Sequence, residues 1–188
     1  MNILNEILEK SRLTKELIGI WKYDDSEKFW CGYVVEYNES LIKLQHFTKY
    51  GKHDGVIIIP IHEIQSIDFN DDYARAMQVI IDYSTELEKQ NKLDFNISEN
   101  ENWRYETLKQ LESSSEIMAN IEFNQNNDSF AGFIIKVDED NFVLHCIGEI
   151  GEDEGMVIYK IEDINTIKIN DMLCRKRTML HKWRKASL

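Results

Sequence analysis

The histidines and cysteines, which could act as bases, nucleophiles or metal ligands, are scattered along this 188-residue chain and form no known motif. The sequence has no GxGxxG, no GxxxxGKS/T, no GxSxG and no HExxH, and no two cysteines are spaced as CxxC. Nothing pairs a cysteine with a base, so we predict no catalytic residue, no cofactor, no metal and a protein that is not an enzyme. The side chains considered are His46, His53, His62, His145, His181, Cys31, Cys146 and Cys174.

Two small polar groups could hold a metal ion. His53, Asp54 and His62 are the first group, and the acids of the segment Glu152–Glu154 are the second, which would suit a hard cation such as calcium. The second copy has Asp153, Glu154 and Glu162 in place of the first group, which disfavours a metal site there. The spacing of the second group lacks a full ligand set, so we interpret it as a solvated acidic loop.

The composition is that of an ordinary acidic globular protein. The chain has 34 Asp and Glu against 22 Lys and Arg, a formal net charge of -12, one proline and eight glycines. These values exclude disordered and collagen-like classes. No apolar stretch reaches about 18 residues, and Glu6 and Glu9 stand where a secretory signal would be basic and then apolar. Three cysteines without disulfide spacing indicate reduced thiols, so we expect a cytoplasmic protein without a membrane span.

The C-terminal segment is the exception to the acidic composition. It predicts an amphipathic helix with Leu173, Leu180 and Trp183 near one face. The helix could pack on its own acidic domain, bind nucleic acid as an arm, or bind an anionic membrane or an acidic partner. We favour packing, because net negative charge repels phosphate and the first copy of the repeat described below has apolar residues at the same helix positions. Residues 172–188 contain six bases and no acid: Arg175, Lys176, Arg177, Lys182, Arg184 and Lys185.

The sequence repeats itself at an offset of 100 residues without a gap. The matched positions are mainly glycines and aliphatic residues, whereas polar positions differ, as in Lys52 against Glu152. A fold was retained while the surface diverged, so we expect a functional site in one copy rather than in both. We predict two domains, 1–90 and 91–188, joined by the polar segment 90–100. The clearest matches are Gly32 with Gly132, Leu44 with Leu144, Gly51 with Gly151, Gly55 with Gly155, Ile58 with Ile158, and Asn70-Asp71 with Asn170-Asp171.

Each copy is predicted to contain a helix, five short strands and a second helix. The first helices are expected over 2–13 and 102–111, from apolar residues at helical spacing. Alternating apolar residues and turn-prone segments predict the strands. A following helix is expected over 72–89, with the basic helix as its counterpart. The strands are expected over 16–23, 29–37, 41–48, 56–61 and 65–69, and again over 116–123, 129–137, 141–148, 156–161 and 165–169.

Two local features indicate strongly bent strands. Cys31, Tyr33, Val35 and Tyr37 alternate along the second strand, and we expect this set to face the core. Gly32 lies within the same strand and would permit a sharp bend. The segment "IPIHEIQSI" changes spacing from two to three and back, which predicts a strand, a tight helical turn and another strand. Five bent strands predict a small closed barrel, because closure removes exposed edges.

This pattern resembles the Sm-like family of small barrels. The resemblance covers about 16–71 and 116–171, and residues 55–69 and 155–169 account for most of it. It implies a mainly β fold with flanking helices, namely two tandem five-stranded Sm-like or SH3-like barrels. RNA-binding members usually have an acidic-x-x-x-Asn pattern and an Arg-Gly or Lys-His element. The loop "YGKHDGV" has Lys52-His53 in that region, whereas "IGEDEGM" has no base.

The favoured function is a non-enzymatic binding or assembly module. Strand edges of such barrels can pair with a neighbour, so we expect a protein partner or self-association into an oligomer. The alternative is an RNA-binding protein that uses Lys52, His53 and the basic C-terminal segment, which the net charge disfavours.

Overall fold

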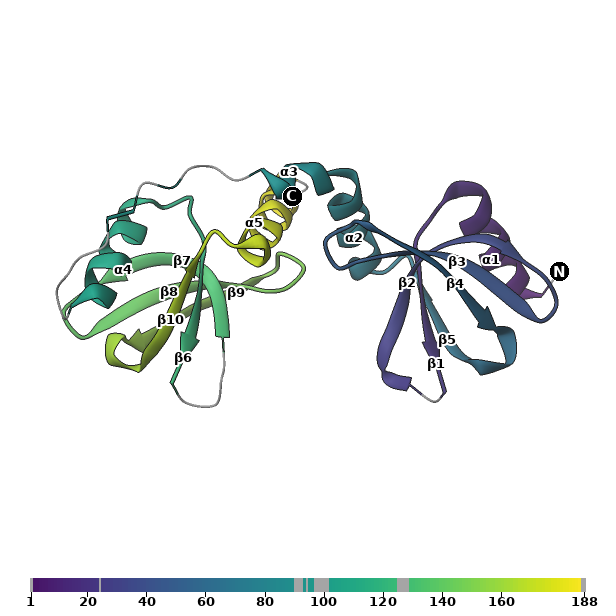
Figure 1. The fold of residues 1–188 in the computed structure, drawn as a ribbon, viewed down its shortest axis with the longest axis horizontal. Coiled ribbons are helices and arrows are strands. Elements are labelled where there is room, and N and C mark those ends of the chain that lie inside the picture. Colours follow the sequence, from purple (N-terminus) through teal and green to yellow (C-terminus); the bar gives the residue numbers. More distant parts are fainter. Residues whose placement is uncertain are drawn as a thin grey trace. The chain divides into compact units, whose positions relative to one another are not determined.

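The computed structural model describes residues 2–23, 25–89, 93, 95–96, 102–124 and 129–186. Within these residues the protein is mainly β, with two five-stranded antiparallel sheets and five α-helices (Figure 1). The chain forms two compact units, residues 1–84 and 85–188. The predicted link over 90–100 falls mostly outside the described residues.

The first unit begins with helix α1 (Ile3–Thr14), as the helical spacing predicted. Its first turn is capped by the Asn2 side chain, which accepts the Asn5 N–H at 2.8 Å. Five strands follow and pair in the order β4-β3-β2-β1-β5, so the five predicted strands are confirmed. The second strand begins at residue 25, four residues earlier than predicted. The strands are β1 (Ile18–Lys22), β2 (Asp25–Tyr37), β3 (Leu41–Phe47), β4 (His53–Pro60) and β5 (Ile64–Phe69).

The second unit repeats this topology. Helix α4 (Trp103–Ser113) precedes a sheet of order β10-β6-β7-β8-β9. Read from β9 to β10, this is the order of the first sheet with each number raised by five. Figure 1 shows α1 and α4 at equivalent places beside the two sheets. The common strand order supports the tandem repeat. The strands are β6 (Ala119–Phe123), β7 (Ser129–Val137), β8 (Asn141–Ile147), β9 (Asp153–Lys160) and β10 (Ile164–Ile169).

The repeated dipeptide Asn-Asp explains how each sheet passes into its last helix. Asn70 and Asn170 have φ of 55° and 51°, a left-handed conformation that asparagine tolerates better than most residues. The side chains of the aspartates that follow accept the N–H of the third residue of α2 (Asp72–Asp82) and of α5 (Met172–Ala186). The distances are 2.7 Å from Ala74 and 2.8 Å from Cys174. The helix starts are therefore encoded locally.

The single helix predicted over 72–89 is wrong. Helix α2 ends at Asp82, its C-cap Tyr83 has φ of -112° and ψ of 19°, and α3 (Ser84–Glu88) is separate. Leu87 of α3 is buried, and its carbonyl accepts a hydrogen bond from the Arg175 side chain of α5 at 2.7 Å. The tertiary contact between Leu87 and α5 thus overrides helix propensity. The predicted tight turn is confirmed as the 3-10 turns η1 (Ile61–Glu63) and η2 (Ile161–Asp163).

The predicted core face of the second strand is partly wrong. Cys31 is buried, but Val35 is 40% exposed and Val34 is buried in its place. The pairing of β2 with β3 shifts between Val34 and Glu36, and β7 shifts at the same point, which leaves Ile135 exposed. One extra residue in a strand reverses the inward and outward alternation after it. The period-two pattern does not reveal where such a bulge occurs.

The predicted closed barrels are not confirmed. Strand β5 pairs with β1 and strand β10 with β6, so these strands lie at the far end of each sheet from β4 and β9. In the described part of the chain no pairing joins β4 to β5 or β9 to β10. Each sheet is open and has two edge strands. The residues that fill the main core of the second unit include Leu108, Leu111, Ile121, Ile134, Phe142 and Leu144.

The turn between the second and third strands is closed by an asparagine side chain in the first unit and by an aspartate side chain in the second, so only the second turn can respond to pH. Asn38 Oδ1 accepts the N–H of Ser40 and Leu41 at 2.8 and 2.9 Å, and Asp138 Oδ1 accepts the equivalent N–H groups at 3.0 and 2.7 Å. The N–H of Asn141 and then that of Asp140 lower the pKa of Asp138. An unfolded Asp has a pKa of about 3.9, so this stabilisation is present above about pH 4 and lost as pH falls through the folded pKa.

We expect Asp138→Asn to remove part of the acid sensitivity of the second unit, because the amide oxygen accepts the same bonds without titrating. Urea midpoints measured between about pH 7 and about pH 2.5 should fall less steeply in this variant than in the wild type. The converse change, Asn38→Asp, should add acid sensitivity to the first unit. Parallel pH curves for all three proteins would contradict the assignment.

Candidate functional site

The arginines predicted to contact nucleic acid or a partner are bonded within their own unit. Arg177 Nη1 donates to the Ile147 carbonyl at 2.5 Å, and Arg184 Nε donates to the Ile150 carbonyl at 2.7 Å. Arg175 donates to the carbonyls of Asn170 and Leu87 at 2.6 and 2.7 Å. Three of the six bases of α5 therefore hold backbone of the same unit.

Helix α5 packs on the sheet of the second unit. Cys174 lies in a buried cluster with Met118 and Ala131, and Leu180 is fully buried. Lys176 is also buried, whereas Lys182 and Lys185 are exposed. The prediction that the basic helix packs on its own domain is therefore confirmed.

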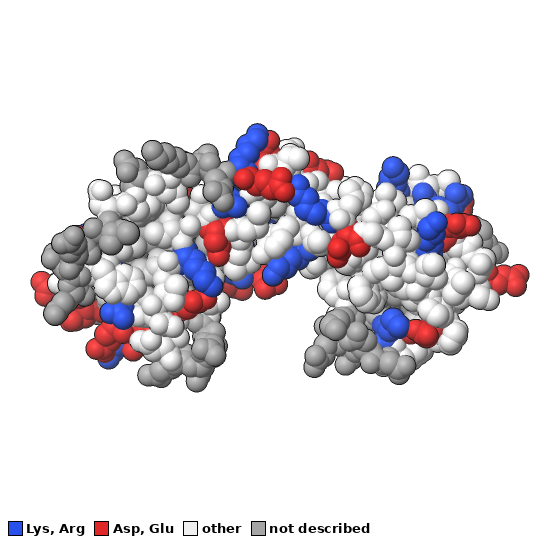
Figure 2. Space-filling view, in the orientation of Figure 1, with Lys and Arg blue, Asp and Glu red and all other residues white. Residues whose placement is uncertain are grey.

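Lys52 lies in the loop that precedes β4 in the first unit, and His53 is the first residue of β4. The Lys52 backbone is held by Thr48, whose N–H donates to the Lys52 carbonyl at 2.8 Å. The Lys52 side chain is half-buried, and His53 is exposed with its ring 4.8 Å from that of Phe47. These two residues and the six bases of α5 thus belong to different units. Figure 2 shows acidic and basic side chains interspersed over the drawn face, without a continuous basic area.

The cysteines are buried, which makes them poor nucleophiles. Burial raises the pKa of the Cys31 thiol to about 12 and raises that of Cys146 and Cys174.

Among the described residues, no group of three His, Cys, Asp or Glu is placed to hold a metal ion. No helix of the described chain has the length and hydropathy needed to cross a membrane.

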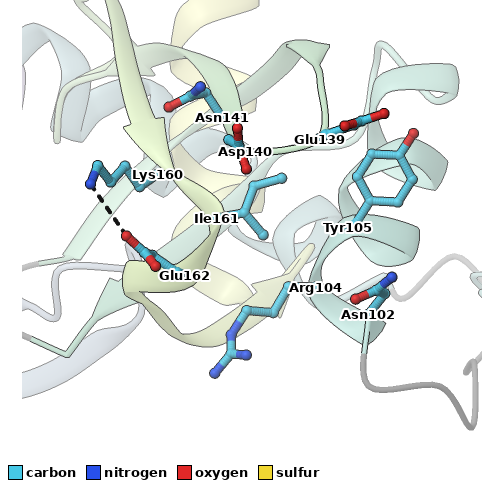
Figure 3. Close-up of a pocket in the computed structure, with 9 residues that line it drawn as sticks. All are labelled: Asn102, Arg104, Tyr105, Glu139, Asp140, Asn141, Lys160, Ile161 and Glu162. Carbon is cyan, nitrogen blue, oxygen red and sulfur yellow. Dashed lines mark hydrogen bonds and ion pairs between the residues drawn. The ribbon is translucent and has the colours of Figure 1, made fainter.

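A polar hollow of about 860 Å³ opens in the second unit between the start of α4 and the turns that follow β7 and β9 (Figure 3). Lys160 reaches Glu162 across 3.2 Å, and Arg104 Nε donates to the Ile164 carbonyl at 2.8 Å. Acids and bases are mixed in the lining, with neither His nor Cys among them, so it favours neither an anion nor a nucleophilic mechanism. The lining residues are Asn102, Arg104, Tyr105, Glu139, Asp140, Asn141, Lys160, Ile161 and Glu162.

A His–Asp pair fixes the start of each outer edge strand. His46 Nδ1 lies 3.4 Å from Asp54, and His145 Nε2 lies 2.9 Å from Asp153. The pKa of Asp153 is lowered first by the Gly155 N–H, which it accepts at 2.9 Å, and then by His145. Both aspartates are more than half exposed. These contacts anchor β4 and β9 to the neighbouring strands, since each histidine belongs to β3 or β8.

The edge strands β4 and β9 expose aliphatic side chains. Val56 and Ile58 of β4 are 47% and 64% exposed, and Met156 and Ile158 of β9 are 64% and 69% exposed. Each strand pairs on one side only, with β3 or with β8. An edge strand with unpaired N–H and C=O groups and exposed apolar side chains can pair with a further strand. These two edges are the candidate functional site.

The edge strands were predicted as strands, but their exposure was not predicted. The run Val56–Ile59 is continuously apolar, which indicates a buried strand when read alone. An apolar run next to the charged residues Asp54 or Glu154 is the one signal that could have indicated an edge. No protein-family model matches the chain, and no curated protein matches it.

Proposed function

We propose that this chain is a non-enzymatic binding and assembly module that associates through the exposed edge strands of its two sheets. The observation that carries the proposal is the exposure of Ile58 and Ile158 in the middle of strands that have one neighbour each. Addition of a strand would satisfy the open backbone groups and remove these side chains from water. The predicted Sm-like relationship is compatible with this role and remains a prediction.

The edges differ in how well they are protected. Proteins guard edge strands with proline, charge or a covering side chain. Strand β4 ends at Pro60, which has no N–H to donate, and the Ile164 carbonyl of β10 is already bonded to Arg104. Between Met156 and Tyr159, strand β9 has no proline and no charged residue. The second unit therefore supplies the less protected outer edge.

RNA binding is the rival function. The engagement of three arginines of α5 with carbonyls of their own unit and the net charge of -12 both disfavour it. A raised ratio of absorbance at 260 nm to that at 280 nm in the purified protein, lost on adding salt, would favour this rival.

The proposal predicts self-association that depends on the edge strands. We expect the wild-type mass, measured by sedimentation equilibrium over roughly a hundredfold range of concentration, to rise with concentration. The double change Ile58→Lys with Ile158→Lys should lower the association constant by at least about tenfold, because a desolvated charge at an edge is costly. Leu13→Lys, which alters an exposed residue of α1, is the control and should associate like the wild type. A wild-type chain that stays monomeric throughout would overturn the proposal.

A further inference from the structure

Strand β9 is self-complementary under a two-fold rotation. From residue 154 to residue 160 it reads Glu-Gly-Met-Val-Ile-Tyr-Lys, with an acid at one end, a base at the other and apolar residues between. When two such strands run antiparallel about Val157, Met156 of one faces Ile158 of the other. The Glu154 end of each strand then lies beside the Lys160 end of the other.

The backbone of β9 is oriented for this pairing. The Ile161 N–H donates to the Asp140 carbonyl at 2.9 Å, toward the β8 side of the sheet. Because donor and acceptor directions alternate along a strand, the backbone groups of Met156, Ile158 and Lys160 point toward the open edge. In the register centred on Val157, Met156 faces Ile158 of the other chain as a pair that exchanges both hydrogen bonds. The register that matches the side chains is therefore also the one that pairs the backbone.

The exposed charges can rearrange at small cost. Lys160 contacts Glu162 at 3.2 Å, with the two side chains 64% and 75% exposed. An ion pair this exposed contributes about 0–1 kcal/mol, so exchanging it for Glu154 of a second copy is feasible. Figure 3 shows the Lys160 side chain extending from its strand toward Glu162.

The equivalent strand of the first unit lacks this complementarity. The same rotation of β4 about Ile57 would place Asp54 beside Pro60, which brings neither a positive charge nor an N–H. The two copies therefore differ at the positions that decide self-pairing. This difference restricts the inference to the second unit.

We propose that β9 pairs antiparallel with β9 of a second copy of this chain, giving a two-fold dimer in which the two sheets join as one ten-stranded sheet. The inference rests on the proposed function, since it names the partner and the edge used by that function. A two-fold contact closes on itself, so the assembly through β9 stops at two chains.

The test uses two single-charge variants of the full chain. Lys160→Glu leaves acids at both ends of β9, and Glu154→Lys leaves bases at both ends, so each variant should dimerise at least about tenfold more weakly than the wild type. Mixed in equal amounts, the two variants should form a heterodimer with near wild-type affinity, because each base then meets an acid. Glu39→Lys, which makes the same charge change at an exposed turn residue outside both edge strands, is the control and should leave the dimer constant unchanged.

A second measurement tests the register. Val157→Cys lies at the rotation axis, where opposite Cα atoms of an antiparallel pair that is not hydrogen-bonded are about 4.5 Å apart. This variant should form a disulfide-linked dimer under mild oxidation, whereas Ile57→Cys should not. Failure of the mixture to recover affinity, together with absence of the crosslink, would overturn the β9 dimer. Loss of association in Ile58→Lys alone would then leave the broader proposal standing, whereas a monomeric wild type would overturn both.

Discussion

Replacing Gly132 with alanine is expected to destabilise the sheet of the second unit strongly. A Cβ at this position would lie 2.1 Å from the His145 carbonyl oxygen and 2.8 Å from its carbon. These are backbone atoms of the paired strand β8, so no side-chain rotation relieves the clash. Strands β7 and β8 would have to separate where the sheet bends. We expect a loss of about 3 kcal/mol or more in the free energy of unfolding.

Gly155→Ala is the matched control for this prediction. Gly155 has φ of 85°, but a Cβ there would meet no atom within 4 Å. This change should cost only the left-handed backbone strain of about 1–2 kcal/mol. Urea unfolding followed by far-UV circular dichroism would compare the two variants, and Gly32→Ala should reproduce the larger loss in the first unit. Equal losses for Gly132→Ala and Gly155→Ala would show that the close approach of the strands is not the cause.

Replacing Phe142 with alanine is the second change with a large expected effect. Phe142 is fully buried in the main core of the second unit, with its ring 5.8 Å from that of Tyr159. Removing the ring deletes its apolar contacts and leaves a cavity that a packed sheet cannot close. The expected loss is about 3–5 kcal/mol.

The control for this change is Phe130→Ala, which removes the same ring from a position that is 37% exposed. Its loss should be much smaller, because water can occupy the vacated space. Chemical unfolding monitored by near-UV circular dichroism would measure both losses. A loss for Phe142→Ala no larger than that for Phe130→Ala would contradict the assignment of Phe142 to the core.

The local elements of this fold could be predicted because each follows from nearby residues. The gapless repeat, the turns closed by Asn38 and Asp138, and the capped helix starts after Asn70 and Asn170 all depend on contacts within a few positions. Apolar patterns together with turn-prone segments located the ten strands for the same reason. Gly32 was predicted to permit a bend, and the structure shows that Gly32 and Gly132 both lie where the backbone of the paired strand leaves no room for a Cβ.

Tertiary structure decided the features that depend on distant partners. The bulge at Val35 moved an apolar side chain out of the core, since the shift is set by how β2 meets β3. Helix α3 separated from α2 because the Leu87 side chain is buried and its carbonyl accepts a hydrogen bond from Arg175 of α5. The open sheets followed from the pairing of β5 with β1, which leaves β4 with a single neighbour.

The candidate site shows the same division. The sequence alone identified the bases of α5, the strand over 156–161 and the loop with Lys52, and it favoured packing of the basic helix on its own domain. It did not identify which backbone groups the arginines bind or which strands lie at an edge. The arginine side chains are bonded to backbone carbonyls that lie about 30 positions away, and Ile158 is exposed because no strand covers its edge. Burial and edge position are properties of the whole sheet, so no local pattern of residues determines them.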